Sequence, residues 1–214
     1  MKNKINGGIY VTQQHLFIDF EFTMSQSKGN PSMFRPEIIE VGVVSVIDEK
    51  IHDTYSSFVK PVLFPKLTER CVGFLGIQQE QVDQGIPLAH LVELLNMYMS
   101  FGPTKVVTWG NQDMKVLRNN CRNSNLECPI KERERDLSKE YQRFFGHKNQ
   151  SGLWRVLEEY GSKGIGKHHR ALDDALTTYE VFKAIEKDKA YMKPTKQPTL
   201  GDRVDFSKIL SQLA

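Results

Sequence analysis

Two carboxylates stand two positions apart inside an apolar run near the start of the chain. Asp19 and Glu21 interrupt the run His15–Thr23, whose letters are HLFIDFEFT. Side chains of a strand alternate between its faces, so this spacing places both carboxylates on one face. Buried carboxylates repel each other and lose hydration, and a divalent cation such as Mg²⁺ or Mn²⁺ compensates both costs. The run therefore indicates either a metal site on a central strand or an edge strand whose polar face meets water.

Three later residues have types that could complete such a site. Asp113 follows a short apolar strand in TWGNQDMKVL, and Asp174 lies in HHRALDDAL on a helix whose apolar side should pack on the sheet. His169 precedes Asp174 by five residues, which is one helical turn plus about 140°, so it would reach the site from the helix entrance. Taken singly, a helix N-terminus explains Asp113 and a solvated surface explains the other two. Their order along the chain favours a joint site.

The surrounding sequence predicts elements that would hold these residues at one sheet. Strands are predicted at 15–23, 38–47 and 51–59, and the short loops between them favour antiparallel pairing. A further strand is predicted at 105–109, and helices at 88–99, 112–121, 136–144, 153–160 and 169–187. This order predicts a three-layer α/β fold: a mixed central sheet with antiparallel first three strands, flanked by helices.

The length and composition favour a single domain. The chain has 214 residues, 39% of them hydrophobic, which suffices for a sizeable core. We expect an N-terminal lead-in over 1–14, the domain itself over 15–192, and a tail over 193–214 that packs across the domain and ends in a short helix near 206–213. No apolar run approaches the roughly 20 residues of a membrane span, and the N-terminus has no apolar core of a secretory signal.

Charge and cysteine content suggest the compartment and the kind of partner. The net charge is +3, with 9 Lys and Arg against 11 Asp and Glu in residues 1–107 and 20 against 15 in residues 108–214. The mild basic excess in the second half is compatible with a face toward a polyanion, or with a solvated helical surface. Three cysteines without a CxxC pair predict reduced thiols and a cytoplasmic location. The lack of a long apolar run predicts no membrane partner.

The combined motifs resemble those of a known enzyme family. DxE on a first strand, an aspartate after a later strand and HxAxxD near the end are similar, in that order, to DEDDh 3′→5′ exonucleases over roughly residues 15–190. The resemblance implies a ribonuclease H-like fold and hydrolysis of phosphodiester bonds with two divalent cations, Mg²⁺ or Mn²⁺. It places the family's acidic metal ligands on Asp19, Glu21, Asp113 and Asp174, and its catalytic histidine on His169.

The two-metal mechanism that the resemblance implies gives each residue a role. Asp19 would bridge both cations, while Glu21 and Asp174 would hold the one that activates water. Asp113 would reach the second cation through water. His169 suits a general base, because an unperturbed histidine has a pKa of about 6.5.

Within the family, the chain looks most like the Eri-type exonucleases that trim RNA 3′ ends. The segments FLGIQ at 74–78, VDQG at 82–85 and TWGNQD at 108–113 carry this resemblance. It implies the 3′ ends of single-stranded nucleic acid as substrate, with RNA favoured over DNA. It also implies that the 74–77 loop contacts the terminal base. We expect substrate contacts from Phe20, Thr23, Leu75, Ile77, Trp109, Asn111 and His168, and the basic residues Lys167 and Arg170 could meet phosphates with His168. Simpler explanations exist for both groups. The residues of the 74–77 loop could pack in the core, and His168, Lys167 and Arg170 could lie at a solvated helix start.

A second hypothesis assigns the same fold to a binding protein without catalytic activity. IDFEFTM, PEIIE, FPKLT and HHRALDDALT also resemble a bacillar member of the family described as an inhibitor of a kinase pathway into sporulation. That resemblance implies a possible partner in a sporulation kinase pathway. A non-catalytic binding protein on a nuclease scaffold would inhibit this pathway by contact alone. An intact set of ligand-type residues weighs against a scaffold without activity.

Overall fold

The computed structural model describes residues 3–4, 10–11, 13–27, 33–132 and 134–192. Its strands are β1 (Asn3–Lys4), β2 (Tyr10–Val11), β3 (Gln14–Phe22), β4 (Ile38–Ile47), β5 (Lys50–Phe58), β6 (Thr104–Thr108) and β7 (Arg135–Asp136). Its helices are α1 (Glu69–Leu75), α2 (Gln79–Asp83), α3 (Leu88–Ser100), α4 (Gln112–Asn123), α5 (Leu137–Phe144), α6 (Leu153–Glu159) and α7 (Ala171–Met192). The expected tail over 193–214, with its short helix, lies outside the described residues.

The central sheet is mixed, as the sequence predicts. Its strand order is β5-β4-β3-β6-β7. The three long strands β3, β4 and β5 pair antiparallel, whereas β6 lies parallel to β3 and β7 parallel to β6. β4 carries the β-branched run IIEVGVVSVI and is buried along almost its whole length, as a strand covered on both faces must be. β3 therefore lies in the middle of the sheet, which excludes the edge-strand explanation for its two carboxylates.

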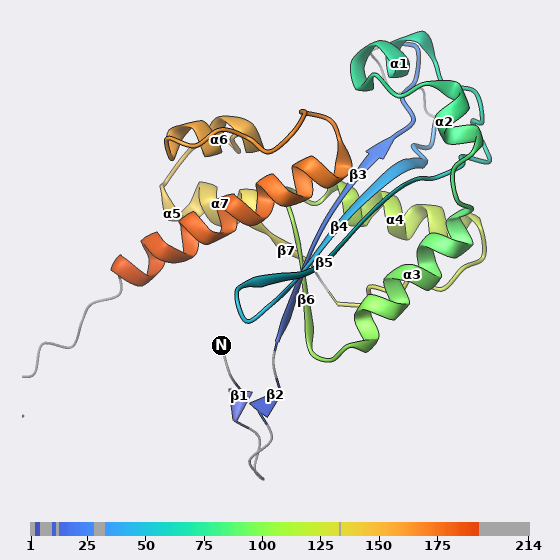
Figure 1. The fold of residues 1–214 in the computed structure, drawn as a ribbon. Coiled ribbons are helices and arrows are strands. Elements are labelled where there is room, and N and C mark those ends of the chain that lie inside the picture. The colour runs from blue at the N-terminus through green and yellow to red at the C-terminus, as the bar shows by residue number, and fades with distance from the viewer. Residues whose placement is uncertain (1–2, 5–9, 12, 28–32, 133, 193–214) are drawn as a thin grey trace, which may run out of the picture.

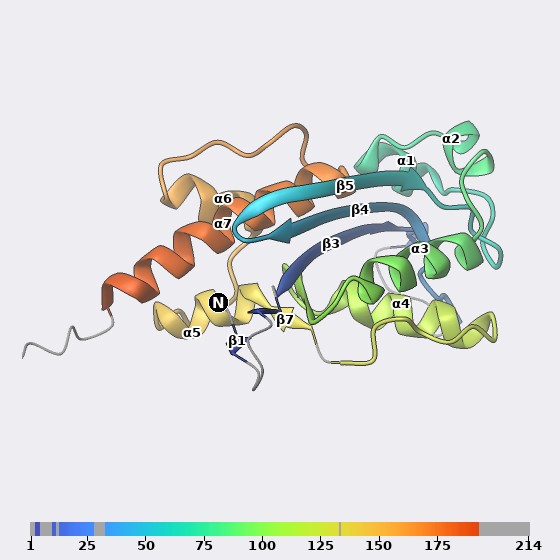
Figure 2. The same cartoon turned by 60° about the horizontal axis from the view of Figure 1, so that its bottom comes forward.

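Helices cover both faces of this sheet and complete the three layers (Figures 1 and 2). α3 and α4 lie on one face, over a core that contains Leu16, Ile18 and Phe20 of β3. α5, α6 and α7 lie on the other face, over a core that contains Phe17. The alternation along β3 thus follows the predicted period of two, and Asp19 and Glu21 share the α7 side with Phe17.

Several element boundaries differ from the sequence prediction. The last helix begins at Ala171 instead of residue 169, because His169 has a φ of 63°, outside the right-handed helical region. Two short helices, α1 and α2, precede the predicted helix at 88–99, which is α3, and α1 ends where Gly76 adopts a φ of 69°. Within the expected lead-in over 1–14, β1 pairs antiparallel with β2, and Gln14 already belongs to β3.

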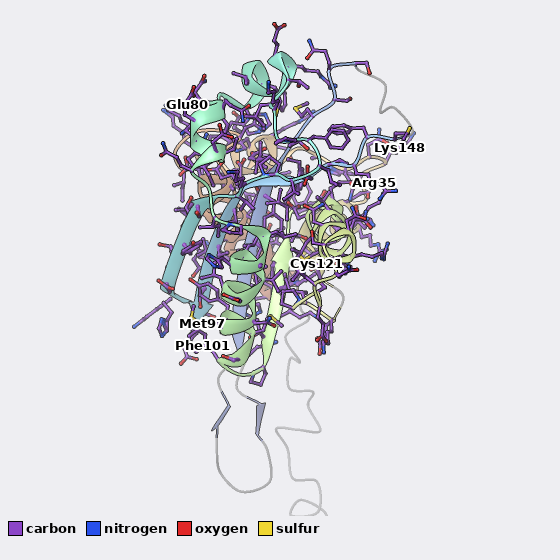
Figure 3. The ribbon with its side chains drawn as sticks, turned by 90° about the vertical axis from the view of Figure 1, so that its right-hand side faces the viewer. Arg35, Glu80, Met97, Phe101, Cys121 and Lys148 are labelled. Carbon is purple, nitrogen blue, oxygen red and sulfur yellow. The ribbon has the colours of Figure 1, made fainter. Side chains whose placement is uncertain are left out.

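Two large exposed apolar side chains lie at the C-terminal end of α3, away from α1 and α2. Figure 3 shows Met97 and Phe101 at the end of α3 that faces away from these two short helices; the two residues are 45% and 61% exposed. None of the described helices is both long and apolar enough to span a membrane.

The start of α7 lies directly on β4 at Gly42. A Cβ atom added to Gly42 would lie 2.1 Å from the carbonyl carbon of Ala171, so only glycine permits this approach of helix and strand. The contact is between backbone atoms, which cannot rotate away as a side chain can. Gly42 therefore fixes where α7 begins relative to the sheet, and with it the position of His169 and Asp174.

Gly42→Ala is expected to lower the free energy of unfolding by about 1–3 kcal/mol, the usual range for overpacking a rigid contact. For a domain of this size the midpoint of thermal unfolding should fall by about 2–4 °C for each kcal/mol. Gly73→Ala in α1 is the matched control, because no atom lies within 4 Å of its added Cβ; it should leave the midpoint unchanged or raise it slightly. Equal midpoints for the two variants would contradict this account of Gly42.

Candidate active site

Four acidic side chains reach one end of the sheet from three different elements. β3 carries Asp19 and Glu21 toward its carboxyl end. Because β6 is parallel to β3, its carboxyl end lies at the same edge, and Asp113 follows there in the first turn of α4. The start of α7, seated on Gly42, brings Asp174 to the same place, and Figure 1 shows the starts of α4 and α7 beside the arrowhead of β3.

The tightest group in this cluster consists of Glu21, His169 and Asp174. One ligand atom from each lies within 4.8 Å of the others. His169 Nδ1 is 4.0 Å from Glu21 Oε1. Asp19 and Asp113 are not part of this tightest group, but the charge of Asp174 acts on both of them, and the charge of Asp113 acts on Asp19. The structure therefore brings all five predicted residues to one site, in an inner group of three and an outer pair.

The burial of these carboxylates makes their ionised forms costly. Burial, and then the charges of Asp113, Asp174 and Glu21, hold the pKa of Asp19 well above its usual range. Burial, followed by the charges of Asp174 and Glu40, raises the pKa of Glu21 to about 8. Burial and the neighbouring carboxylates therefore both favour the protonated forms of Asp19 and Glu21.

Asp113 is held by the backbone of the neighbouring strand. Its side chain is buried, and its Oδ1 accepts a hydrogen bond of 3.1 Å from the Phe20 amide in β3. Burial raises the pKa of Asp113 to about 7, although this hydrogen bond opposes the shift. The bond across β3 fixes the carboxylate beside Asp19, so the helix-dipole explanation alone does not describe the residue.

Asp174 is buried and both of its oxygens accept hydrogen bonds. Oδ1 accepts from the indole Nε1 of Trp154 in α6, and Oδ2 accepts from the His169 amide at 3.0 Å. Burial raises the pKa of Asp174, and these two hydrogen bonds oppose the shift. Each oxygen keeps a second lone pair, so the carboxylate can still bind a cation.

His169 stands in the loop before α7 and contacts two other rings. Its ring centroid is 3.8 Å from that of His168, nearly parallel, and 4.3 Å from that of Phe74 in α1. Burial and the neighbouring His168 lower the pKa of His169, which keeps its imidazole neutral near pH 7. The neutral form can accept a proton, as a general base must.

Sequence reasoning missed one acidic residue of this region. Glu40 of β4 lies directly opposite Glu21 in the antiparallel register and is buried. Its Oε1 accepts a hydrogen bond of 2.7 Å from Arg170, whose guanidinium also lies over the Phe58 ring. Arg170, expected to contact phosphate, is therefore engaged with the protein instead, because a buried carboxylate needs a counter-charge. A glutamate inside the apolar run of β4 was the signal in the sequence.

The predicted base-contacting loop presents a different side chain from the two expected. Ile77 is fully buried in a small core under α1 and α2 with Ile39 and Val82, and Leu75 is 7% exposed in the same cluster. The placement of Ile77 as a base contact is corrected, because its side chain faces this core and not solvent. Phe74 is 55% exposed and touches His169. It is the apolar surface that this loop offers beside the site.

The other predicted substrate contacts differ in how accessible they are. The Phe20 ring is buried in the core beneath α3 and α4, so only its backbone faces the site. Thr23 is buried, and its hydroxyl accepts a hydrogen bond of 2.9 Å from the Glu37 amide. The indole of Trp109 donates to the Ser151 carbonyl oxygen, and so it points toward the α5–α6 side. Asn111 and His168 are exposed.

The residues present suit hard divalent cations. Carboxylate oxygens from β3, α4 and α7 converge, and Glu21, His169 and Asp174 offer ligand atoms within 4.8 Å of one another. The raised pKa values of Asp19, Glu21 and Asp113 are what a cation would reverse, since its charge favours the ionised forms.

Comparison with known proteins agrees with this geometry. The Exonuclease family model (RNase_T) matches residues 16–182. The probable 3′-5′ exonuclease KapD of Bacillus subtilis (strain 168) is 48% identical over 201 residues, 94% of this chain and 98% of that protein. The 3′-5′ exoribonuclease 1 of Mus musculus is 34% identical over 204 residues, 90% of this chain and 59% of that protein.

A solved structure extends the likeness to the fold. The nuclease domain of 3′hExo, a DEDDh family member bound to rAMP, matches with a TM-score of 0.74 and 28% identity, covering 82% of this chain and 92% of that one. The family depends on divalent metal, in keeping with the acidic cluster. This chain therefore belongs to the Exonuclease family and is a 3′→5′ exonuclease of the DEDDh type.

Proposed function

We propose that this protein removes nucleoside 5′-monophosphates from the 3′ ends of single-stranded nucleic acid, RNA in preference to DNA, by a two-metal mechanism with a histidine base. The convergence of Asp19, Glu21, Asp113 and Asp174 with His169 at the carboxyl end of β3 carries the proposal. The cations, Mg²⁺ or Mn²⁺, supply when bound the charge that activates the attacking water and stabilises the leaving 3′ oxygen.

The residues of the chain divide this work between them. Asp19, central among the other carboxylates, would help to hold both cations, and Glu21 and Asp174 would hold the one that activates water. Asp113, fixed by the Phe20 amide, would serve the second cation through water. His169 lies 4.0 Å from Glu21, and its lowered pKa favours a neutral ring. Both observations support a role as the base that would take a proton from the attacking water.

The substrate strand would meet the site where the exposed rings lie. Phe74, exposed and touching His169, is proposed to stack on the terminal base, since an apolar ring accepts any base. His168 and Lys167, both exposed beside it, are available to phosphates. A preference for RNA is supported by the exoribonuclease name of the mouse relative and by the rAMP in the structural neighbour.

A labelled oligonucleotide tests the proposed activity. Matched 5′-labelled single-stranded RNA and DNA are incubated with the protein in MgCl₂, in MnCl₂ or in EDTA. We expect a ladder that shortens from the 3′ end in the presence of metal, faster on RNA, with free 5′-monophosphates as product and no reaction in EDTA. Cleavage inside the strand, or no shortening with either metal, would contradict the proposal; faster loss of DNA would contradict the preference alone.

His169→Gln is expected to lower kcat by about 100-fold, the lower part of the range for general acid–base catalysis. The affinity for Mn²⁺ should fall much less than kcat, because the four carboxylates are untouched. Initial rates at pH 7.5 and calorimetric titration with MnCl₂ measure the two effects. His90→Gln, exposed on α3 across the sheet, is the matched control. A rate within twofold of wild type would remove His169 from the mechanism.

The binding-protein hypothesis is not favoured. A scaffold that acts only by contact has no need to bury several like charges around one point, and such burial costs stability without a cation. The proposed sporulation kinase partner stays a prediction from resemblance. It would be supported if a catalytically inactive, folded Asp19→Asn variant still inhibited sporulation.

A further inference from the structure

Trp154 reaches the acidic cluster from outside it. It belongs to α6, a helix that carries none of the predicted site residues, and its indole Nε1 donates a hydrogen bond to Asp174 Oδ1. The His169 amide holds the other oxygen of the same carboxylate. Trp154 therefore supplies one of two directional hydrogen bonds that set the rotation of the Asp174 carboxylate.

The same indole also lies at the end of a row of neighbouring rings. Its centroid is 5.2 Å from that of His168, which stacks on His169 at 3.8 Å, and His169 contacts Phe74 at 4.3 Å. Residues 161–170, which carry His168 and His169, form no helix or strand. The row of rings thus ties this loop to α6 on one side and to α1 on the other.

The loop backbone is shaped to receive the indole. A Cβ atom added to Gly164 would lie 2.0 Å from Trp154 Cζ3, so the ring occupies the space that any other residue would need. Further along, the Lys167 amide donates to Asp173 Oδ2 at 2.7 Å and the Ile165 amide to Thr177 Oγ1 at 3.2 Å. One face of the loop rests on α7 through these bonds, while Gly164 and His168 rest on Trp154.

We propose that Trp154 is a positioning residue of the active site: its N–H orients Asp174 toward the cation, and its ring supports the loop that carries His169. The inference rests on the proposed function, since it gives Asp174 the role of metal ligand. Groups that orient a metal ligand without touching the metal commonly change metal affinity or activity by about 10- to 100-fold when removed. The resemblance to the family did not point to this residue, and SGLWRVLEEY by itself predicts only an amphipathic helix.

Trp154→Phe separates the hydrogen bond from the ring, because phenylalanine keeps an aromatic side chain without the N–H. We expect Mn²⁺ alone, titrated by calorimetry into the full-length protein, to bind about 10-fold or more weakly. At low MnCl₂ kcat should fall, and raising MnCl₂ should restore it, while KM for the oligonucleotide stays unchanged. A loss of folding would not be restored by metal in this way. Arg155→Gln is the control on the same helix, since that side chain is 78% exposed.

Gly164→Ala tests the same inference with Trp154 still present. The added methyl group must displace the indole, so this variant should also weaken Mn²⁺ binding, with circular dichroism unchanged. A fluorescence titration adds a direct readout, since the chain has two tryptophans. With Trp109→Phe as background, the remaining Trp154 emission should change on adding MnCl₂. With Trp154→Phe as background, the Trp109 emission should stay constant.

The outcomes separate this inference from the proposed function. If the wild-type protein neither binds Mn²⁺ nor shortens an oligonucleotide, the proposed function fails and the inference falls with it. The inference alone is overturned if the wild type does both while Trp154→Phe and Gly164→Ala bind Mn²⁺ as tightly as the wild type and show the same dependence of kcat on MnCl₂. If Trp154→Phe does not fold, two other measurements test the inference. These are the Mn²⁺ affinity of Gly164→Ala and the change of Trp154 emission on adding MnCl₂ to the Trp109→Phe variant.

Discussion

Asp19→Asn is expected to remove nearly all exonuclease activity and, at the same time, to stabilise the metal-free protein. Loss of a ligand shared by two cations should cost at least about 1,000-fold in kcat, or about 4 kcal/mol of transition-state stabilisation. The gain in stability has a separate cause. Asp19 lies among the charges of Asp113, Asp174 and Glu21, and burial penalises its ionised form, so a neutral amide relieves repulsion.

Thermal unfolding in EDTA and in MnCl₂ measures the second effect. In EDTA the variant should unfold above the wild type, by about 2–4 °C for each kcal/mol of repulsion relieved. In MnCl₂ the difference between the two unfolding midpoints should become smaller or change sign, because metal binding stabilises the wild type. Asp48→Asn is the matched control: Asp48 is exposed in the β4–β5 turn with a φ of 49°, which asparagine also adopts. A variant that loses activity and also unfolds earlier in EDTA would contradict the proposed repulsion.

The metal-free protein is expected to lose stability as the pH rises from about 4.5 to 8, where many proteins are most stable. The pKa of Glu21 is raised by burial and neighbouring carboxylates from 4.5 to about 8. A carboxyl with a higher pKa in the folded than in the unfolded state keeps its proton longer when folded. The contribution of the protonated Glu21 carboxyl to the free energy of unfolding is complete below pH 4.5 and is lost as the pH rises to about 8. A shift of this size corresponds to about 5 kcal/mol for Glu21.

Urea unfolding at several pH values between 4.5 and 8.5, in EDTA and in MnCl₂, tests this expectation. The pKa of Asp113 is also raised, to about 7, so part of the loss is shared and the two contributions do not add. In MnCl₂ the decline should disappear, because the cation favours the ionised carboxylates. Glu21→Gln should flatten the decline in EDTA. A urea midpoint that is constant with pH in EDTA would show that the ionised carboxylates do not destabilise the fold as proposed. A midpoint that falls with pH as much in MnCl₂ as in EDTA would show the same.

The local sequence determined the elements and the identity of the central residues. The period of two along HLFIDFEFT placed Asp19 and Glu21 on one face, and the apolar residues on both sides indicated a buried strand. The order of the DxE, Asp113 and HxAxxD motifs indicated the family. These signals are visible without a structure because each depends on residues close together in the chain or on their order.

Tertiary structure decided which neighbours complete the site. Glu40 meets Glu21 only through the antiparallel register, and Trp154 reaches Asp174 only because α6 packs beside α7. The end of α1 shows the same limit: FLGI at 74–77 does not reveal that Ile77 turns into a core and leaves Phe74 beside His169. The two carboxylates of β3, the family and the order of the main elements can be predicted from the amino-acid sequence alone. Only the fold decided which charges surround them and which rings carry His169, because these contacts join residues far apart in the chain.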